Sequence, residues 1–233
     1  MNLLLVDPAV DEVGPGRATI TGERVRHVRK VLRKREGDIL RVGVLGGRMG
    51  TGRITALSPT RLTVAWDALD VPPPAKRPLT LMFALCRPPM MQRILQAAAS
   101  FGVAEILWFP AARTEASFLD SHVLRADGIR RALRLGLAQG RDTLLPRSEG
   151  LATFDEAVRR VETAPGRKLL ARAGAPACPC GATDPTCVIV GPEGGLLPDE
   201  EARFLAAGAR AVGLGPWTLR TEVAVAALLG RFV

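Results

Sequence analysis

The chain has 233 residues, of which 47% are hydrophobic, 32 are Lys or Arg and 23 are Asp or Glu, giving a formal net charge of +9. This hydrophobic fraction excludes an intrinsically disordered chain, because disorder requires low hydrophobicity as well as high net charge. No apolar run reaches the roughly 18 to 20 residues that would cross a bilayer, and the N-terminus lacks the basic start of a signal peptide. We therefore expect a cytoplasmic protein of one or two domains that has no membrane partner.

Up to about Trp66 the sequence predicts short strands and one helix, which favours a small β-barrel or meander. The strands are expected at Leu3–Val6, Ala18–Ile20, Ile39–Leu45, Gly52–Leu57 and Arg61–Trp66, and the helix at Glu23–Lys34. Four prolines then fall within residues 71–78, and they can sustain neither a helix nor a central strand. We therefore assign an N-terminal domain to residues 1–70 and a linker to residues 71–78.

The predicted N-terminal helix is strongly basic. Apolar residues at helical spacing can face the core and leave seven cations outside, with no acid among them. These are Arg24, Arg26, Arg29, Lys30, Arg33, Lys34 and Arg35. Because cations cannot neutralise one another, they need an external anion, and their spacing suits the phosphate backbone of a nucleic acid. The alternative is a solvated helix face that pairs with Glu23, Glu36 and Asp38, and the charge of the whole chain favours nucleic acid.

Arginine accounts for 28 of the 32 basic residues. Its planar, bidentate side chain suits phosphate, which also favours contact with nucleic acid. Codon choice in a GC-rich genome explains the ratio of Arg to Lys better, but it does not explain the net charge.

After the linker, strands and helices alternate, which predicts an α/β domain with a buried parallel sheet over residues 79–233. Strands are expected at Leu79–Leu85, Ile106–Phe109, Lys168–Ala171 and Cys187–Val190. Helices are expected at Met90–Phe101, Ser121–Gln139, Phe154–Val161, Pro198–Ala207 and Thr221–Phe232, with Ser121 as a candidate N-cap. The four cysteines lack the spacing and the fourth ligand of a zinc site, so we expect free thiols and no metal.

Two glycine-rich loops follow apolar strands in this second domain. Gly191–Gly195 leads into a helix that starts near Pro198, and such turns let a nucleotide-like ligand approach backbone N–H groups. A tight turn alone would explain the glycines but not Glu193. In the second loop, Thr221 is expected to cap a helix that is apolar all round and therefore buried in the core or at a subunit interface. Arg220 and Glu222 would then need partners: each other, a ligand, or a second subunit.

Three motifs carry a resemblance to a known family. The segments GPEGGLLPDEE (191–201) and LGPWTLRTEVA (214–224) resemble the S-adenosylmethionine motifs of the SPOUT methyltransferases. More narrowly they resemble those of the 16S ribosomal RNA uridine N3-methyltransferases, the RsmE family. RHVRKVLRKREGD (26–38) is similar to the PUA-like RNA-binding domain of the same family.

The resemblance implies an α/β trefoil-knot domain preceded by a small PUA-like β-barrel, in a homodimer that acts on 16S ribosomal RNA or the small ribosomal subunit. The methyl donor S-adenosylmethionine would contact three loops. The cofactor-binding residues implied are Leu170, Ala171, Gly191, Pro192, Glu193, Gly194, Gly195, Leu214, Gly215, Leu219, Thr221 and Ala224. Arg113 would contact RNA from a facing loop.

Methylation at N3 of uridine requires loss of the N3 proton, and the site must supply a base or stabilise the anion. We assign Arg220 as the stabilising cation. Glu222 orients Arg220 or accepts the proton through water, and Glu193 counters the sulfonium charge.

The helix after the linker departs from the family pattern K-M-E-x-x-x-x-K-x-x-E-L-G, because Met90, Gln92, Ala97 and Ser100 stand at its charged positions. An alternative is therefore a noncatalytic or altered-specificity RNA-binding or ribosome-assembly paralogue that keeps the dimeric scaffold. A nucleotide-binding oxidoreductase is disfavoured because no G-x-G-x-x-G follows an early strand.

Overall fold

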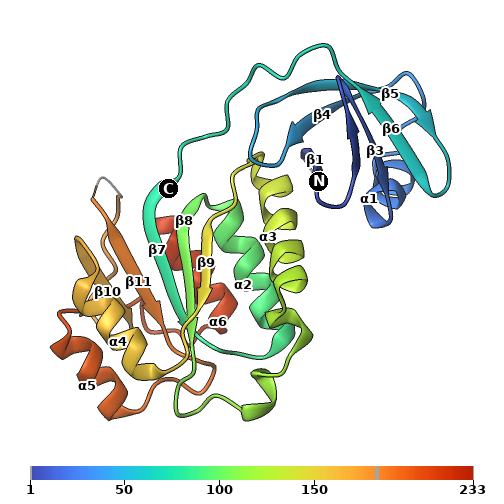
Figure 1. Ribbon diagram of the computed structural model, residues 1–233. Coiled ribbons are helices and arrows are strands. Elements are labelled where there is room, and N and C mark those ends of the chain that lie inside the picture. The colour runs from blue at the N-terminus through green and yellow to red at the C-terminus, as the bar shows by residue number, and fades with distance from the viewer. Residues whose placement is uncertain (1, 182–183, 233) are drawn as a thin grey trace. The chain divides into compact units, whose positions relative to one another are not determined.

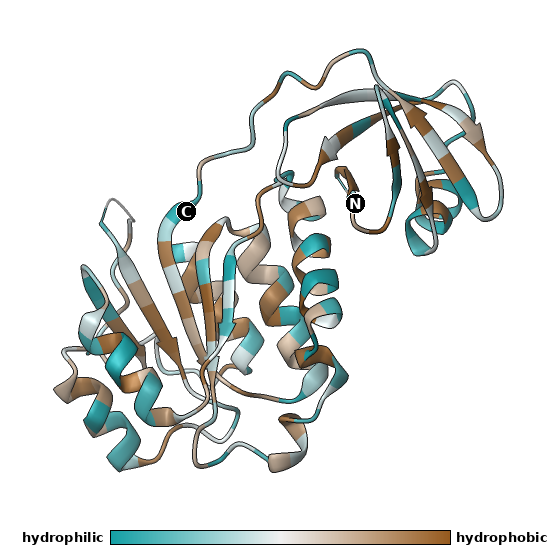
Figure 2. Cartoon of the chain, in the orientation of Figure 1, coloured by the Kyte–Doolittle hydropathy of each residue, from teal (hydrophilic) through white to brown (hydrophobic). Residues whose placement is uncertain are grey.

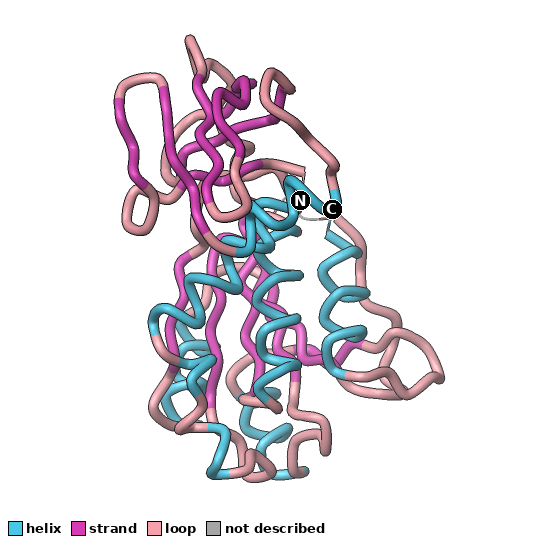
Figure 3. Tube along the Cα trace, turned by 90° about the vertical axis from the view of Figure 1, so that its right-hand side faces the viewer, coloured by secondary structure: helices cyan, strands magenta, loops and turns pink. Residues whose placement is uncertain are grey.

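The computed structural model describes residues 2–181 and 184–232. The chain divides into two compact units, of which the first comprises Met1–Ala75 with Arg134–Leu145 and the second Lys76–Leu133 with Pro146–Val233. The sequence interpretation assigns 134–145 to the second domain. Within the described ranges, no helix is long and apolar enough to cross a membrane. Figure 3 shows that the first unit is mostly strands and loops, whereas the second combines strands with several longer helices.

The first unit is built on a six-stranded sheet with the order β1-β4-β5-β6-β3-β2. The strands are β1 (Leu4–Val6), β2 (Glu12–Gly14), β3 (Arg17–Thr21), β4 (Ile39–Val44), β5 (Met49–Leu57) and β6 (Arg61–Ala65). Only β1 and β4 pair in parallel, and the other neighbours are antiparallel. The sequence favours a small β-barrel or meander, and the sheet curves into a half-barrel whose two edges are the three-residue strands β1 and β2 (Figure 1).

The basic helix of the first unit is shorter than predicted. An α-helical turn, α1 (Glu23–Arg26), continues as a π-helical turn over His27–Val31, and Arg33 then takes a left-handed φ of 52°. The wider turn brings the N–H of Leu32 to the carbonyl of His27 at 3.0 Å. Val25 and Val28 are buried against the sheet, as their spacing predicts. The cations therefore lie on an irregular turn and not on one regular helix face.

The second unit is an α/β layer around a six-stranded sheet with the order β12-β10-β11-β7-β8-β9, in which every pairing is parallel. The strands are β7 (Arg77–Ala84), β8 (Val103–Phe109), β9 (Arg147–Gly150), β10 (Arg167–Ala171), β11 (Thr186–Val190) and β12 (Arg210–Val212). All residues of the central strand β11 are buried. The predicted α/β class and parallel sheet are confirmed.

The helices of the second unit cover its sheet. They are α2 (Pro88–Ser100), α4 (Phe154–Thr163), α5 (Pro198–Ala206) and α6 (Thr221–Leu229), whereas α3 (Ala126–Gly140) begins in the second unit and ends in the first. On the side of α4 and α5, the rings of Phe109, Phe154 and Phe204 pack edge to face or tilted against one another in the core, and both helices carry hydrophobic as well as hydrophilic residues (Figure 2). Helix α6 packs on α2 and β11. These contacts fix the residues around the strand ends that form the site.

The single helix predicted over Ser121–Gln139 is wrong, because the chain breaks it in two. A 3₁₀ turn covers His122–Leu124, Arg125 is extended, and α3 starts at Ala126. The Ser121 hydroxyl caps the 3₁₀ turn by accepting the N–H of Val123 at 3.3 Å. Further 3₁₀ turns cover Ala116–Phe118 and Gly230–Phe232.

Candidate active site

One pocket lies at the carboxyl ends of strands β10, β11 and β12. Because parallel strands end at the same edge of a sheet, the loops that follow them converge there. The pocket is lined by Ala171–Ala173 after β10, by the glycine loop after β11, by the segment after β12 and by the start of α6. Its volume of about 320 Å³ suits a small-molecule ligand.

Ten of the twelve residues that the resemblance implies for the methyl donor line this pocket. They are Ala171, Gly191, Pro192, Glu193, Gly195, Leu214, Gly215, Leu219, Thr221 and Ala224. The other two do not: Leu170 is buried in the sheet, and the carbonyl oxygen of Gly194 accepts a hydrogen bond from Arg113. The sequence did not indicate Arg172 and Glu201, which also line the pocket. Arg172 comes directly after a predicted strand, so the strand-end rule could have found it.

Two glycines show how closely the backbones approach at this edge. Gly195 takes a left-handed φ of 74° at the end of the glycine loop. At Gly213, an added Cβ would lie 2.5 Å from the carbonyl oxygen of Ala175. The carbonyl oxygen of Gly213 accepts a hydrogen bond from the N–H of Cys178 at 2.9 Å. The loop after β10 is thereby held against the segment after β12.

A carboxylate lies in the wall of the pocket. The Oε1 atom of Glu193 accepts the backbone N–H of Arg87, the N-cap residue of α2, at 3.1 Å, which holds the carboxylate in place. Burial, followed by the charges of Glu193 and Glu222, raises the pKa of the neighbouring Cys86 thiol to about 12. Cys86 is therefore a neutral thiol near neutral pH and is not a nucleophile of this site.

The structure corrects two predictions about the start of α6 and excludes one of the three partners considered for Arg220 and Glu222. Arg220 is exposed and not buried, and Thr221 does not cap the helix but is its first residue. Arg220 and Glu222 do not pair, because side chains two positions apart at the start of a helix do not face each other. Glu222 instead pairs with Arg93 of α2, with 3.3 Å between Arg93 Nη1 and Glu222 Oε1. The Oε2 atom of Glu222 is buried and has no hydrogen-bond partner within the described ranges.

Arg113 follows strand β8 and reaches the glycine loop. Its guanidinium donates a hydrogen bond to the carbonyl oxygen of Gly194 while the side chain stays exposed. The loop that carries it is fixed by the buried Glu200, whose Oε1 accepts the N–H of Ala112 at 2.7 Å. The exposed guanidinium is thus anchored next to the pocket.

In the first unit, five of the seven predicted RNA-binding cations surround a second depression, which we call the basic pocket. They are Arg29, Lys30, Arg33, Lys34 and Arg35. The two nearby acids are otherwise engaged, because Glu36 accepts the N–H of Leu57 and Asp38 accepts that of Arg35. In the part of the chain that the structure describes, none of the five forms an ion pair. Arg26 is exposed outside the pocket.

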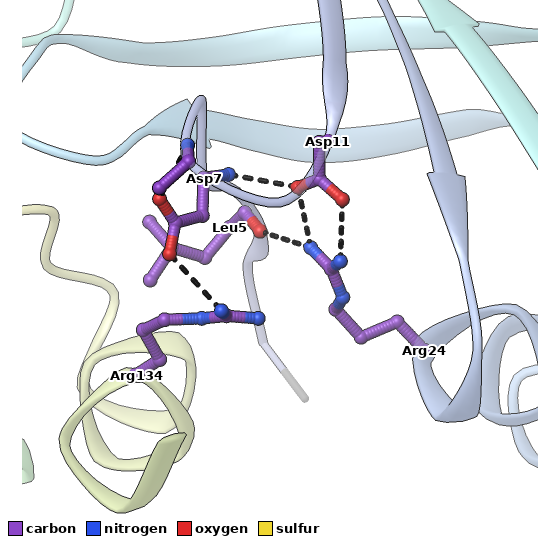
Figure 4. A network of polar contacts seen from close by, with 6 residues as sticks. Leu5, Asp7, Asp11, Arg24 and Arg134 are labelled. Carbon is purple, nitrogen blue, oxygen red and sulfur yellow. Dashed lines mark hydrogen bonds and ion pairs between the residues drawn. The ribbon is translucent and has the colours of Figure 1, made fainter. Parts of the chain in front are cut away.

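Arg24 does not belong to this surface, contrary to the sequence prediction. Its guanidinium forms two hydrogen bonds with Asp11, at 2.5 and 2.8 Å, and a third with the carbonyl oxygen of Leu5 at 2.9 Å (Figure 4). The backbone N–H of Asp7 donates to Asp11, and Arg134 pairs with Asp7 at 3.0 Å. Arg24 therefore contributes to the interior of the first unit, because it pairs with the buried carboxylate of Asp11.

No group of three or more His, Cys, Asp or Glu residues suited to a metal ion occurs among residues 2–181 and 184–232. All four cysteines are free thiols.

Comparison with known proteins agrees with this fold. Residues 73–233 match the family described as an RNA methyltransferase domain, and residues 20–65 match the RNA methyltransferase PUA domain. The chain is 29% identical over 237 residues to ribosomal RNA small subunit methyltransferase E of Treponema pallidum, covering 97% of this chain and 88% of that protein. It is 31% identical over 241 residues to the protein of the same name from Mycobacterium bovis, covering 91% and 84%.

A crystal structure of ribosomal RNA small subunit methyltransferase E from Neisseria gonorrhoeae bound to S-adenosylmethionine superimposes with a TM-score of 0.71, at 24% identity over 99% of this chain and 95% of that one. Together these findings define the chain as an RNA methyltransferase with a PUA domain. More narrowly, it belongs to the family of the ribosomal RNA small subunit methyltransferases E.

Proposed function

We propose that this protein transfers a methyl group from S-adenosylmethionine to N3 of a uridine in the 16S ribosomal RNA of the small ribosomal subunit. The observation that carries the proposal is the pocket at the ends of β10, β11 and β12, beside which Glu222 holds a buried carboxylate oxygen without a partner. The relatives named above act on small-subunit ribosomal RNA by their names, which supports the same substrate class here.

The donor pocket fits S-adenosylmethionine in its chemistry. Its walls combine apolar side chains such as Leu196 and Val212 with loop backbone, which suits an adenine ring. The carboxylate of Glu193 places negative charge where a sulfonium cation would be attracted. Arg172 and Glu201 face each other at 3.9 Å and offer groups of both signs to the polar ends of the ligand. We propose that the ten lining residues contact the donor, and that Leu170 and Gly194 support the loops around it.

The reaction requires the uracil N3 proton to leave, because the protonated imide is a poor nucleophile. When bound, S-adenosylmethionine supplies an electrophilic sulfonium methyl group. Glu222 Oε2 accepts the N3 proton, and Arg220 stabilises the negative charge that spreads onto the uracil oxygens. Holding the base, the cation and the nucleotide in one geometry supplies the remaining rate enhancement.

The substrate RNA is held by phosphate contacts at the basic pocket, with Arg26 beside it and Arg113 next to the donor pocket. Five cations without ion-pair partners around one depression support this role. Because its substrate is ribosomal RNA, the protein acts in the cytoplasm.

The C-terminal segment forms a trefoil knot and contributes to a homodimer in this proposal. Two features support the knot: β12 lies at one edge of the sheet while α6 packs on α2 and β11, and the segment between them is pinned against the loop after β10. Exposed apolar side chains before and at the start of α6 support the dimer, since Trp217 is 77% and Val223 47% exposed.

The test uses small subunits from cells that lack the gene, tritiated donor and mass spectrometry of the digested RNA. We expect the wild-type protein to form one N3-methyluridine and Arg220→Ala to lose about a hundredfold or more in rate, because a charge-stabilising donor is removed. Donor binding, measured by calorimetry, should be unchanged. Arg210→Ala on β12, an exposed arginine outside the pocket, is the matched control.

Full activity in Arg220→Ala would refute the role of Arg220. A wild-type protein that binds the donor but methylates no ribosomal RNA would favour the noncatalytic scaffold.

A further inference from the structure

The one charged residue of helix α2 lies next to Glu222, the proposed base. Arg93 is the one ionisable residue between Pro88 and Ser100, and its guanidinium lies 3.3 Å from Glu222 Oε1. Arg93 is therefore the one charge that α2 can offer to Glu222.

The two carboxylate oxygens of Glu222 have different surroundings. Oε1 pairs with Arg93, whereas Oε2 is buried and has no hydrogen-bond partner in the described chain. A buried acceptor without a partner costs free energy, so such an atom is usually found where a ligand or a reacting group completes it. Glu222 does not itself line the donor pocket, but its charge and that of the lining residue Glu193 both act on the thiol of Cys86, so the two carboxylates lie near the same side chain. The free oxygen thus belongs to a residue at the edge of the reaction site.

The ion pair joins an exposed cation to a shielded carboxylate. The Arg93 side chain is 64% exposed while that of Glu222 is 13% exposed, so solvent screens the guanidinium more than the carboxylate. A glutamate has three rotatable side-chain bonds, and an anchor at one oxygen restricts where the other can lie. The pair is therefore better suited to orienting a carboxylate than to holding two helices together.

We infer that Arg93 is a positioning residue for methyl transfer, which holds Glu222 by Oε1 so that Oε2 stays free to take the N3 proton of the uridine. In this step the N3–H bond breaks, the proton is bound by Oε2 and the electron pair remains on N3. The inference rests on the proposed function.

The first test compares steady-state methyl transfer by Arg93→Ala, Arg93→Lys and a matched control, Arg147→Ala. Arg147 is also an exposed arginine that pairs with a shielded carboxylate, Glu105 at 3.4 Å. We expect Arg93→Ala to lower kcat about tenfold, less than the about hundredfold that loss of the base itself would cost. KM for the donor and for the RNA should stay within about twofold, since neither is contacted. Arg93→Lys should restore most of kcat, and Arg147→Ala should match the wild type.

The second test asks whether Arg93 acts through Glu222. In the double variant Arg93→Ala/Glu222→Gln, the rate should equal that of Glu222→Gln within about twofold, because residues that act as a unit are not additive. Thermal melting of all variants confirms that they are folded. Independent losses that multiply would overturn the inference, as would full activity in Arg93→Ala. A wild-type protein that methylates no RNA would instead overturn the proposed function itself.

Discussion

Replacing Arg24 by Ala should destabilise the first unit strongly, although Arg24 belongs by sequence to a run of surface cations. The Asp11 side chain is fully buried, and Arg24 is 18% exposed, so the pair is shielded from solvent. The substitution removes both hydrogen bonds to Asp11 and the one to the Leu5 carbonyl. The Asp11 carboxylate would keep the backbone N–H of Asp7 as a donor, at 2.8 Å, but no cation from Arg24.

Breaking a buried ion pair in this way costs about 3–5 kcal/mol, because the remaining charge is desolvated and uncompensated. Since Asp11 keeps one donor, we expect about 3 kcal/mol. The matched control is Arg61→Ala in the same unit. Arg61 also forms two hydrogen bonds with one carboxylate, because its Nη2 donates to both oxygens of Glu12. Both of those side chains are more than half exposed, so the control should cost about 0–1 kcal/mol.

Urea unfolding followed by the fluorescence of Trp66 measures the effect in the first unit, whose core Trp66 packs against. The measurement uses a Trp108→Phe/Trp217→Phe background, so that Trp66 is the one remaining tryptophan. The second substitution Asp11→Asn in Arg24→Ala should recover part of the loss, because it removes the unpaired charge. If Arg24→Ala costs no more than Arg61→Ala, the assignment of Arg24 to the interior is wrong.

Two further predictions concern the surface cations and the thiols. In the basic pocket, Arg29→Glu should weaken binding of 16S ribosomal RNA about tenfold at low salt and reduce the slope of log K against log salt by about one, with unchanged thermal stability. Filter binding across salt concentrations checks this, and an equal loss in Arg41→Glu on strand β4 would contradict a specific role of the pocket. Among the cysteines, the exposed Cys180 should react first with an aromatic disulfide reagent at pH 8. Cys86 should stay unreactive until urea unfolds the protein. Its raised pKa of about 12 leaves only about one thiol in ten thousand ionised at pH 8, and fast modification of Cys86 in the native protein would show this reasoning to be wrong.

The amino-acid sequence alone predicted most strands, the parallel sheet and the loops that meet at the donor pocket. These features depend on local patterns: an apolar run such as Cys187–Val190 predicts a buried strand, and glycines after it predict a tight turn. Strand β9 was missed because all its residues are polar or small and exposed at the edge of the sheet. Its strand pairing comes from β8 and not from its own composition.

Which charged side chains act together was decided by the tertiary structure. Arg24 and Arg29 belong to the same basic run, but a buried Asp11 draws Arg24 inward and leaves Arg29 on the surface. Likewise Glu222 pairs with Arg93, 129 residues away in the chain, and not with its near neighbour Arg220. A charge pairs with the nearest opposite charge in space, and a sequence pattern shows only which residues are near along the chain. The packing of α6 on α2 therefore determines that Glu222 pairs with Arg93.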